Sequence, residues 1–316
     1  MMSRAEHAIV VETLTKRYGN LIAVDSISFT VRKGEVFAFL GPNGAGKTTT
    51  VEIIETIRTP TSGKVSVLGI DVTKKKRDIV RRIGVLPQGF SSFDRVTVRE
   101  SIQYYSRLFG SKTTDVNGLI ELANLKDKSH EQFKNLSGGL KQRLGIVIAL
   151  VNDPEIVFLD EPTAGLDPRA RREVWEVMLS LKKKGKTVFL TTHYIEEAEF
   201  LADTVAIISK GRIIAIGSPD ELMENSVNEL SLTLRTSNAN VFNIVKEIGF
   251  DPIYHNPHDI KVQVKSADDI RRILDAIKNA GASLLGLDVR KPNLEEVFLK
   301  LTGEVVYEEL AEEASK

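Results

Sequence analysis

The sequence predicts an α/β fold built on a parallel sheet, followed by a smaller α+β domain. Between residues 156 and 209, short apolar runs alternate with amphipathic stretches, as is typical of buried parallel strands joined by helices. Near residues 217–224 this pattern ends, and shorter alternating segments follow. We therefore expect one domain at residues 1–225 and a second at 226–303.

The first domain divides into three stretches. Residues 1–90 are rich in strands, and helical spacing begins near Lys47. A helical subdomain is expected at about residues 91–150, and strands alternate with helices after it. The predicted strands are 9–14, 26–31, 36–40, 156–159, 187–191 and 204–209, and the predicted helices are 97–108, 115–124, 139–151, 168–184 and 195–202.

The second domain is expected to follow the order β-α-β-β-α-β-α. Apolar residues alternate over 230–234, 260–264 and 285–289, and helical spacing occurs over 241–248, 267–280 and 294–301. This order has the split βαβ character of a ferredoxin-like module. The acidic residues 304–316, which are poor in apolar side chains, are expected to be a frayed tail.

Composition excludes several classes of function. Lys+Arg and Asp+Glu both number 43, so the formal net charge is zero and a broad nucleic-acid-binding surface is not expected. The chain has no cysteine, which excludes disulfides, thiolate catalysis and cysteine-bound zinc and suits a reducing compartment. No signal peptide is recognisable, and the longest apolar runs are far shorter than the ~18–20 residues that span a bilayer.

A glycine-rich loop follows the predicted strand at residues 36–40. It reads Gly41, Pro42, Asn43, Gly44, Ala45, Gly46, Lys47, Thr48 and Thr49 and matches the pattern G-x-x-x-x-G-K-[ST]. Glycines let successive N–H groups point at phosphate oxygens, and the following helix presents its positive end to the same anion. Lys47 would reach the β- and γ-phosphates, and the Thr48 hydroxyl is a hard ligand for Mg²⁺. The loop therefore predicts a nucleotide site.

Other polar residues follow predicted strands. Asp160 and Glu161 end the apolar run at 156–159, where Asp160 could hold Mg²⁺ and Glu161 could take a proton from an attacking water. Taken alone, these acids could equally be a solvated strand end. His193, after the strand at 187–191, is more often a cap than a catalyst, and Gln88 alone would pass as a surface glutamine.

A second glycine pair opens the predicted helix at 139–151. Ser137 can cap this helix, while Gly138 and Gly139 expose its first N–H groups and create a second anion-binding end. One polypeptide does not need two such ends for one triphosphate. Two chains placed head-to-tail do, because each helix end can then close over the nucleotide bound in the loop of the other.

Residues 9–225 resemble the ATP-binding cassette (ABC) family, with the family's motifs in order. Residues 41–49 match Walker A, 136–140 the signature, and 156–161 Walker B with the catalytic glutamate. Residues 85–88 match the Q-loop, 165–167 the D-loop, and 191–193 the switch histidine. The signature departs from the commonest family form at Leu140, where Gln is usual. Because Ser137 and the glycine amides face the nucleotide, we expect activity to survive this change.

The resemblance implies a fold, cofactors and site roles. The fold is a P-loop NTPase cassette with a RecA-like core sheet, an N-terminal antiparallel β part and a helical subdomain. ATP and Mg²⁺ are the implied cofactors. Tyr18 corresponds to the aromatic residue that stacks on adenine, and Ser137, Gly138 and Gly139 would contact the nucleotide of a second cassette. The implied catalytic residues are Glu161, His193, Lys47 and Gln88, and the implied Mg²⁺ ligands are Thr48, Gln88 and Asp160.

The last residues narrow the resemblance. Residues 291–303 are similar to the ending of cassettes paired with ABC-2 type permeases, although the same spacing also suits an ordinary amphipathic helix. This similarity implies an exporter ATPase that works as a dimer on the cytoplasmic face of a membrane, held there by a separate permease. A soluble ABC ATPase acting on nucleic acid or ribosomes is the alternative, and a regulatory module without turnover is a third reading that Glu161 and His193 disfavour.

Overall fold

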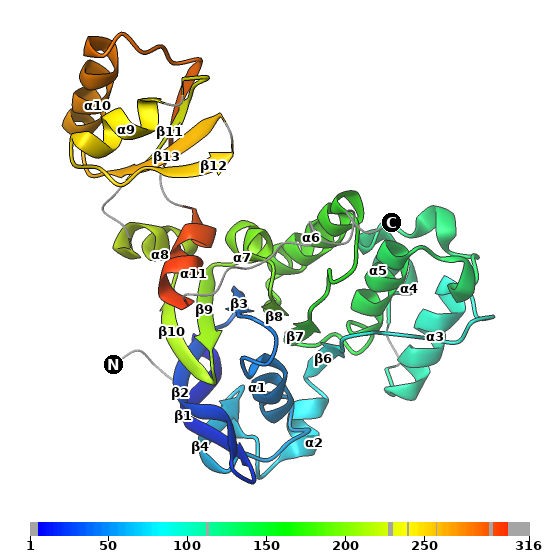
Figure 1. Cartoon of the computed structure of the whole chain (residues 1–316). Helices are drawn as coiled ribbons and strands as arrows, with labels where there is room; N and C mark the ends of the chain where they lie inside the picture. The colour runs from blue at the N-terminus through cyan, green and yellow to red at the C-terminus, as the bar shows by residue number, and fades with distance from the viewer. Residues whose placement is uncertain are drawn as a thin grey trace. The chain divides into compact units, whose positions relative to one another are not determined.

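The computed structural model describes residues 6–111, 114–226, 230–238, 240–256, 258–290 and 293–302, and the chain separates into two units, Met1–Pro219 and Asp220–Lys316 (Figure 1). The expected boundary after residue 225 lies inside helix α8 (Pro219–Ser226), so the second unit begins a few residues before the position predicted from the sequence. The tail expected at residues 304–316 lies outside the described residues.

A six-stranded sheet lies at the centre of the first unit, in the order β10-β9-β3-β8-β7-β6. Neighbouring strands from β9 to β6 run parallel, and β10 pairs antiparallel with β9. Strands β3 and β7 are buried along their whole length, which explains their continuous apolar runs. The predicted parallel sheet is confirmed. Its strands are β3 (Val36–Leu40), β6 (Ile83–Leu86), β7 (Ile156–Asp160), β8 (Thr187–Thr192), β9 (Thr204–Ser209) and β10 (Arg212–Gly217).

A four-stranded antiparallel sheet, in the order β2-β1-β4-β5, packs against this core. The ring of Phe29 on β2 stacks on Phe37 of β3, with ring centroids 5.3 Å apart. Strands β1 and β2 are longer than predicted and shift register several times, because bulges let a long pair of strands bend. The antiparallel part implied by the family resemblance is confirmed. Its strands are β1 (His7–Tyr18), β2 (Leu21–Arg32), β4 (Ser62–Val67) and β5 (Ile70–Asp71).

Three helices occupy the chain between β6 and β7 and lie together beyond the β6 edge of the core sheet (Figure 1). They are α3 (Val98–Leu108), α4 (Val116–Leu122) and α5 (Gly138–Ile148), each within a few residues of a predicted helix. Helix α3 begins at a capping box, in which the Thr97 hydroxyl accepts from the N–H of Glu100 and the Glu100 carboxylate accepts from the N–H of Thr97. Short 3₁₀ turns at Lys126–Lys128 and Phe133–Asn135 connect α4 to α5.

Each of the other helices described next directly follows or precedes a strand of the core sheet. Helix α1 (Lys47–Ile54) follows β3, α6 (Pro168–Lys183) follows β7, and α7 (Ile195–Leu201) follows β8. A short helix that was not predicted, α2 (Lys76–Val80), precedes β6. Because parallel strands end at the same edge of a sheet, the loops after β3, β6, β7 and β8 meet at one edge, where open α/β sheets bind ligands.

The second unit has its own antiparallel sheet, in the order β12-β13-β11-β14. Leu232, Leu234, Ile260 and Val262 of its central strands pack against Val241 and Ile273 of its helices. The order of elements agrees with the prediction, and the ferredoxin-like assignment stays a prediction. The elements are β11 (Leu230–Arg235), α9 (Asn240–Glu247), β12 (Ile253–Asn256), β13 (Asp259–Val264), α10 (Ala267–Asn279), β14 (Gly286–Arg290) and α11 (Leu294–Thr302).

Within the ranges that the structure describes, no helix combines the length and the apolar character needed to cross a membrane.

Candidate functional site

The glycine-rich loop between β3 and α1 is held by close main-chain contacts. A Cβ atom at Gly41 would lie 2.2 Å from the Ile208 carbonyl oxygen, and one at Gly46 would lie 2.5 Å from that of Ala23. Gly46 is also the N-cap of α1 and has φ 105°, which L-residues rarely adopt. Glycine at these positions therefore allows the loop to lie against the core while its N–H groups remain available to an anion.

Lys47 lies at the mouth of this loop, with 5% of its side chain exposed. Its Nζ atom donates to the carbonyl oxygens of Gly41 at 2.7 Å and Pro42 at 3.2 Å, and lies 3.3 Å from Oε1 of Glu161. Burial lowers the pKa of the Lys47 ammonium, while Glu161 and Asp160 act in the opposite direction. A phosphate bound in the loop would offer oxygens in place of these three acceptors.

The two acids at the end of β7 differ in environment. Asp160 accepts a hydrogen bond from the Thr191 hydroxyl on β8, and burial raises the pKa of its carboxyl. The pKa of Glu161 is lowered, first by the His193 side chain and then by Lys47, against the opposing effect of burial. Glu161 therefore keeps its charge at neutral pH, as a proton acceptor requires.

Glu161 also has an uncommon backbone conformation, with φ 47°. Its N–H group is 3.1 Å from both the carbonyl oxygen and the hydroxyl of Thr191, so β8 fixes the turn that follows β7. Positive φ in a residue with a Cβ costs roughly 1–2 kcal/mol and is concentrated at functional sites. The turn directs the Glu161 carboxylate toward Lys47.

Gln88 and His193 lie next to Oε2, the second carboxylate oxygen of Glu161. The Gln88 side-chain amide, in the loop after β6, donates to Oε2 of Glu161 at 3.1 Å. His193 Nδ1 lies 3.4 Å from the same Oε2 atom, and within the described part of the chain this buried nitrogen makes no hydrogen bond of ordinary geometry. The structure thus brings together three residues, Lys47, Gln88 and His193, around one carboxylate.

The other residues of the loop line its open side. Asn43, Gly44 and Thr48 are exposed, whereas Ala45 is buried and Pro42, Gly46 and Thr49 are partly buried. In the described ranges no cluster of three or more His, Asp, Glu or Cys residues could hold a metal ion by itself. Mg²⁺ commonly binds through one or two protein oxygens together with nucleotide phosphates, and Thr48 and Asp160 fit that kind of site.

Tyr18 ends strand β1 and is 39% exposed. The Lys16 ammonium is 5.1 Å and the Arg58 guanidinium 5.7 Å from the centre of its ring. A ring with this exposure can still stack on a planar base.

Ser137, Gly138 and Gly139 begin helix α5, and their neighbours are residues near the start of α6. A Cβ at Gly138 would lie 3.2 Å from Leu166, and one at Gly139 would lie 2.8 Å from the Cβ of Ala170. Ser137 caps the helix only loosely, since the N–H of Leu140 is 3.5 Å from its hydroxyl. Ser137 and Gly138 are exposed, and among the described residues no hydrogen bond or ion pair joins either of them to Lys47 or Glu161. Gly165 has φ 71°, and the Asp167 carboxylate caps α6.

Sequence reasoning missed several buried polar residues around this cluster. Glu197 on α7 is fully buried and accepts hydrogen bonds from the Thr163 hydroxyl at 2.8 Å and the Trp175 indole at 3.0 Å. Burial raises the pKa of Glu197, and the hydroxyls of Thr192 and Thr163 oppose this shift. The sequence around Glu197 carries no signal of these contacts, because Thr163 and Trp175 lie in distant parts of the chain.

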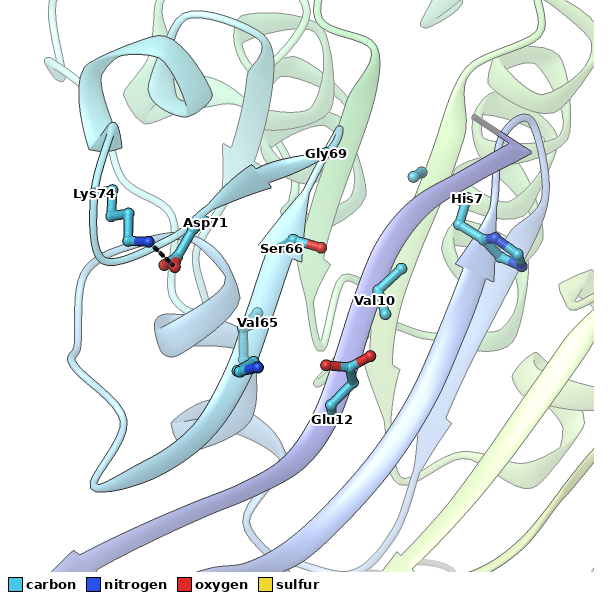
Figure 2. A pocket seen from close by; sticks show the side chains of 10 residues that line it. His7, Val10, Glu12, Val65, Ser66, Gly69, Asp71 and Lys74 are labelled. Atoms are coloured by element: carbon cyan, nitrogen blue, oxygen red, sulfur yellow. Dashed lines mark ion pairs between the residues drawn. The ribbon is translucent and has the colours of Figure 1, made fainter. Parts of the chain in front are cut away.

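A separate hollow of about 300 Å³ lies over β1, β4 and β5 (Figure 2). Its Asp71 and Lys74 form an ion pair at 3.6 Å, and Glu12 lies opposite Lys64 in the strand register. None of the predicted nucleotide residues lines this hollow.

Comparisons with known proteins identify the family. A family model described as ABC transporter matches residues 24–164. The Nod factor export ATP-binding protein I of Mesorhizobium japonicum is 39% identical over 305 residues, covering 92% of this chain and 85% of the relative. The protein of the same name from Rhizobium etli is 39% identical over 300 residues, covering 94% and 93%. This chain is an ATP-hydrolysing cassette of the ABC transporter family.

Solved ABC cassettes share the fold. An ATP-binding subunit of an ABC transporter superposes with a TM-score of 0.61 and 27% identity, covering 69% of this chain and 92% of that subunit. A dimeric cassette in a post-hydrolysis state, bound to ADP and Pi, gives a TM-score of 0.59 and 25% identity, covering 66% and 98%.

Proposed function

We propose that this cassette powers export through a separate permease of the ABC-2 type, at the cytoplasmic face of a membrane. Relatives named Nod factor export ATP-binding protein I match it at 38–39% identity over 85–95% of their own length. The similarity of residues 291–303 to the ending of ABC-2 cassettes supports the same permease class. A role on nucleic acid or ribosomes is disfavoured by the export relatives and by the zero net charge.

The single observation that carries the ATPase site is the convergence of Lys47, Gln88 and His193 on Glu161. In the proposed site the loop amides and Lys47 bind the phosphates, and Glu161 takes a proton from the attacking water. His193 and Lys47 offset charge on the γ-phosphoryl group. Bound Mg²⁺, held by Thr48, Gln88 and Asp160, would supply charge neutralisation between the phosphates.

The site is proposed to be completed by a second cassette. The exposed start of α5, with Ser137, Gly138 and Gly139, offers N–H groups and a hydroxyl that the same chain does not use at its own loop. Two chains related by a two-fold axis would each close the other's nucleotide. The dimeric post-hydrolysis relative bound to ADP and Pi supports this arrangement.

A groove beside the Q-loop is the proposed contact with the permease. It measures about 450 Å³ and is lined by residues from the end of α1, by β6 and by α3 and α5. Ile57, Val80 and Phe109 on its walls are 65%, 47% and 56% exposed. Pro87 and Gly89, the two neighbours of Gln88 in the chain, also line the groove. A partner bound in the groove would therefore contact residues adjacent to Gln88, whose side-chain amide donates a hydrogen bond to Glu161. Large exposed apolar patches mark interaction sites.

The test is reconstitution of the full chain with the ABC-2 type permease encoded beside it. We expect the two to purify together and transport to stop when Glu161 is replaced by Gln. A complex that forms with DNA or ribosomes, and not with the permease, would overturn the export proposal. The ATPase assignment would survive that outcome, because it is measured on the cassette alone.

A further inference from the structure

The distance between His193 and Glu161 is not set by a direct bond between them. His193 Nδ1 lies 3.4 Å from Oε2 of Glu161 and, within the described part of the chain, makes no hydrogen bond of ordinary geometry. Each residue lies in the segment that follows its strand, β8 for His193 and β7 for Glu161. Their separation is therefore fixed by the contacts that hold these two segments together.

One set of contacts lies where the two strands end. The N–H group of Glu161 is 3.1 Å from both the carbonyl oxygen and the hydroxyl of Thr191. The next residue, Thr192, accepts a hydrogen bond at its carbonyl oxygen from the N–H of Gly41 at 3.2 Å. These bonds fix the start of each segment, and they do not involve the residues that come after Glu161 and His193.

A buried carboxyl group makes a second contact, beyond both residues in the chain. Glu197 lies on α7, one helical turn after His193, and is 0% exposed. Its Oε1 atom accepts from the hydroxyl of Thr163, two residues after Glu161, at 2.8 Å. Thr163 is also fully buried, so water does not compete for this bond. One carboxyl group thus joins the turn that carries Glu161 to the helix that follows His193.

Two residues one turn apart on α6 reinforce this contact. The Trp175 indole N–H donates to the same Oε1 atom of Glu197 at 3.0 Å. The Arg171 guanidinium lies 4.2 Å from the ring centre of Tyr194, and that ring centre is 4.1 Å from the ring centre of His193. Residues four apart share one face of a helix, so α6 holds both ends of the segment 194–197.

A carboxyl group is a costly choice at this position if it only fills space. Burial raises the pKa of Glu197, because the charged form is disfavoured away from water. The Thr192 hydroxyl and the Arg171 charge oppose this shift, yet in the described ranges Oε2 makes no hydrogen bond of ordinary geometry. Replacing a buried charged group by an apolar one of similar volume often leaves stability unchanged. Holding the two segments in one arrangement therefore explains the carboxyl group better than packing does.

We propose that Glu197 is a positioning residue, which holds His193 at its working distance from Glu161 by binding Thr163. Because Glu197 is fully buried, it acts through His193 and not on the nucleotide. This inference rests on the proposed roles of Glu161 and His193 in ATP hydrolysis, and it adds the contact that keeps the two side chains together.

The experiment measures steady-state ATP turnover of the full chain. Thr163→Val keeps the shape of the side chain and removes the donor to Glu197. We expect kcat to fall by roughly ten-fold and KM for ATP to stay within about two-fold, because the phosphate loop is unchanged. Thr163→Ser keeps a hydroxyl and should restore most of kcat. The matched control is Glu199→Gln, which changes an exposed acid on α7 and should turn over ATP at the unmodified rate.

Double-mutant cycles test whether the effect passes through Glu197 and His193. In a His193→Ala chain, Thr163→Val should lower kcat by less than about two-fold further, since the residue to be positioned is gone. Glu197→Leu removes both carboxyl oxygens at similar volume and should lower kcat by roughly ten-fold or more. In that chain Thr163→Val should again have little further effect. A general loss of stability would instead add in full to each single change.

The chain's single tryptophan shows whether each variant is folded. Trp175 is 3% exposed, and its indole stacks on Phe200 with ring centres 5.0 Å apart. Its emission and its protection from acrylamide quenching should be unchanged in Thr163→Val and Thr163→Ser, which leave the indole and its acceptor in place. Thermal unfolding followed by the same emission compares the stability of the variants.

The outcomes separate this inference from the proposed site. If Thr163→Val and Glu197→Leu both turn over ATP normally, Glu197 does not position His193 and the inference is wrong. If their effects add in full to that of His193→Ala, they act elsewhere and the inference is also wrong. If His193→Ala itself turns over ATP normally, the proposed role of His193 fails and the inference fails with it.

Discussion

The two proposed anion-binding regions of this chain are built in opposite ways. At the phosphate loop, Lys47 and Glu161 are largely buried and paired with each other, and the Lys47 ammonium also donates to a fixed main-chain oxygen. At the start of α5, Ser137 and Gly138 are exposed, and the Ser137 hydroxyl makes only a loose 3.5 Å cap. The first region holds its geometry within one chain. The second presents groups whose proposed use requires a second chain.

The difference has a physical basis in desolvation. Burying Lys47 beside Glu161 offsets the cost of removing each charge from water, so this half of the site can form in one chain. The neutral N–H groups at a helix start can remain exposed to water at little cost in free energy. Their interaction with an anion becomes stronger when a second surface covers the anion and excludes solvent.

The largest effect is expected for Glu161→Gln. Removing the general base should lower the ATP turnover rate by about 10²–10⁴-fold while ATP still binds, because the loop and Lys47 remain. Steady-state phosphate release and light scattering with ATP·Mg²⁺ measure the two effects, and we expect an ATP-bound dimer. Glu176→Gln, an exposed acid on α6, is the matched control. A strictly monomeric Glu161→Gln chain would contradict the two-chain site.

Lys47→Ala should act on binding itself. Loss of the ammonium at the loop is expected to weaken ATP affinity by roughly 100-fold, as for other preorganised charges aimed at phosphate. A titration with a fluorescent ATP analogue measures this, with Lys184→Ala at the exposed C-cap of α6 as the control. An unchanged ATP affinity in Lys47→Ala would contradict the assignment of residues 41–49 as the phosphate-binding loop.

Ser137→Arg should impair the nucleotide site of the partner chain and leave the phosphate loop of its own chain intact. The bulky cation is expected to leave ATP affinity of the single chain within about two-fold and to lower turnover by roughly ten-fold or more, since it blocks closure over the other nucleotide. Mixing Ser137→Arg chains with Glu161→Gln chains gives the sharper measurement. Mixed pairs keep one intact site, so activity should recover to about a quarter of normal. No recovery would mean that each site is complete within its own chain.

The smallest effect is expected for Tyr18→Ala. Loss of stacking on adenine should weaken ATP affinity by about five-fold, which corresponds to roughly 1 kcal/mol. Tyr18→Phe keeps the ring and should bind like the unmodified chain. Equal affinity for ATP and inorganic triphosphate in the unmodified chain would exclude an aromatic stack at this position.

The local parts of the candidate site could be proposed from the sequence. The phosphate loop is contiguous, and its glycines, Lys47 and Thr48 are specified by the geometry of one turn and one helix start. Asp160 and Glu161 follow a predicted strand, so a carboxylate site could be expected there from the residues, whereas Gln88 and His193 were assigned to the site only through the family resemblance. Strands β4, β5, β6 and β10 and helix α2 were not predicted, and β5 and α2, with two and five residues, are too short to show a periodic pattern.

Features that depend on contacts between distant residues could not be predicted from the sequence. The positive φ of Glu161 follows from its bonds to Thr191, and the burial of Glu197 follows from Thr163 and Trp175 on other elements. Glu55 is one of many acids in the sequence, and only packing of β6, α3 and α5 around it makes it a buried carboxyl in an apolar groove.

The sequence by itself determined that the chain binds a nucleotide and belongs among the ABC cassettes, because phosphate recognition depends on short, contiguous backbone geometry. Only the tertiary structure shows that Lys47 and Glu161 are buried and paired with each other within one chain. Burial and pairing depend on atoms that the fold brings together from distant residues. The exposed helix start at Ser137 was visible as a motif, but its openness became evident only in the folded chain.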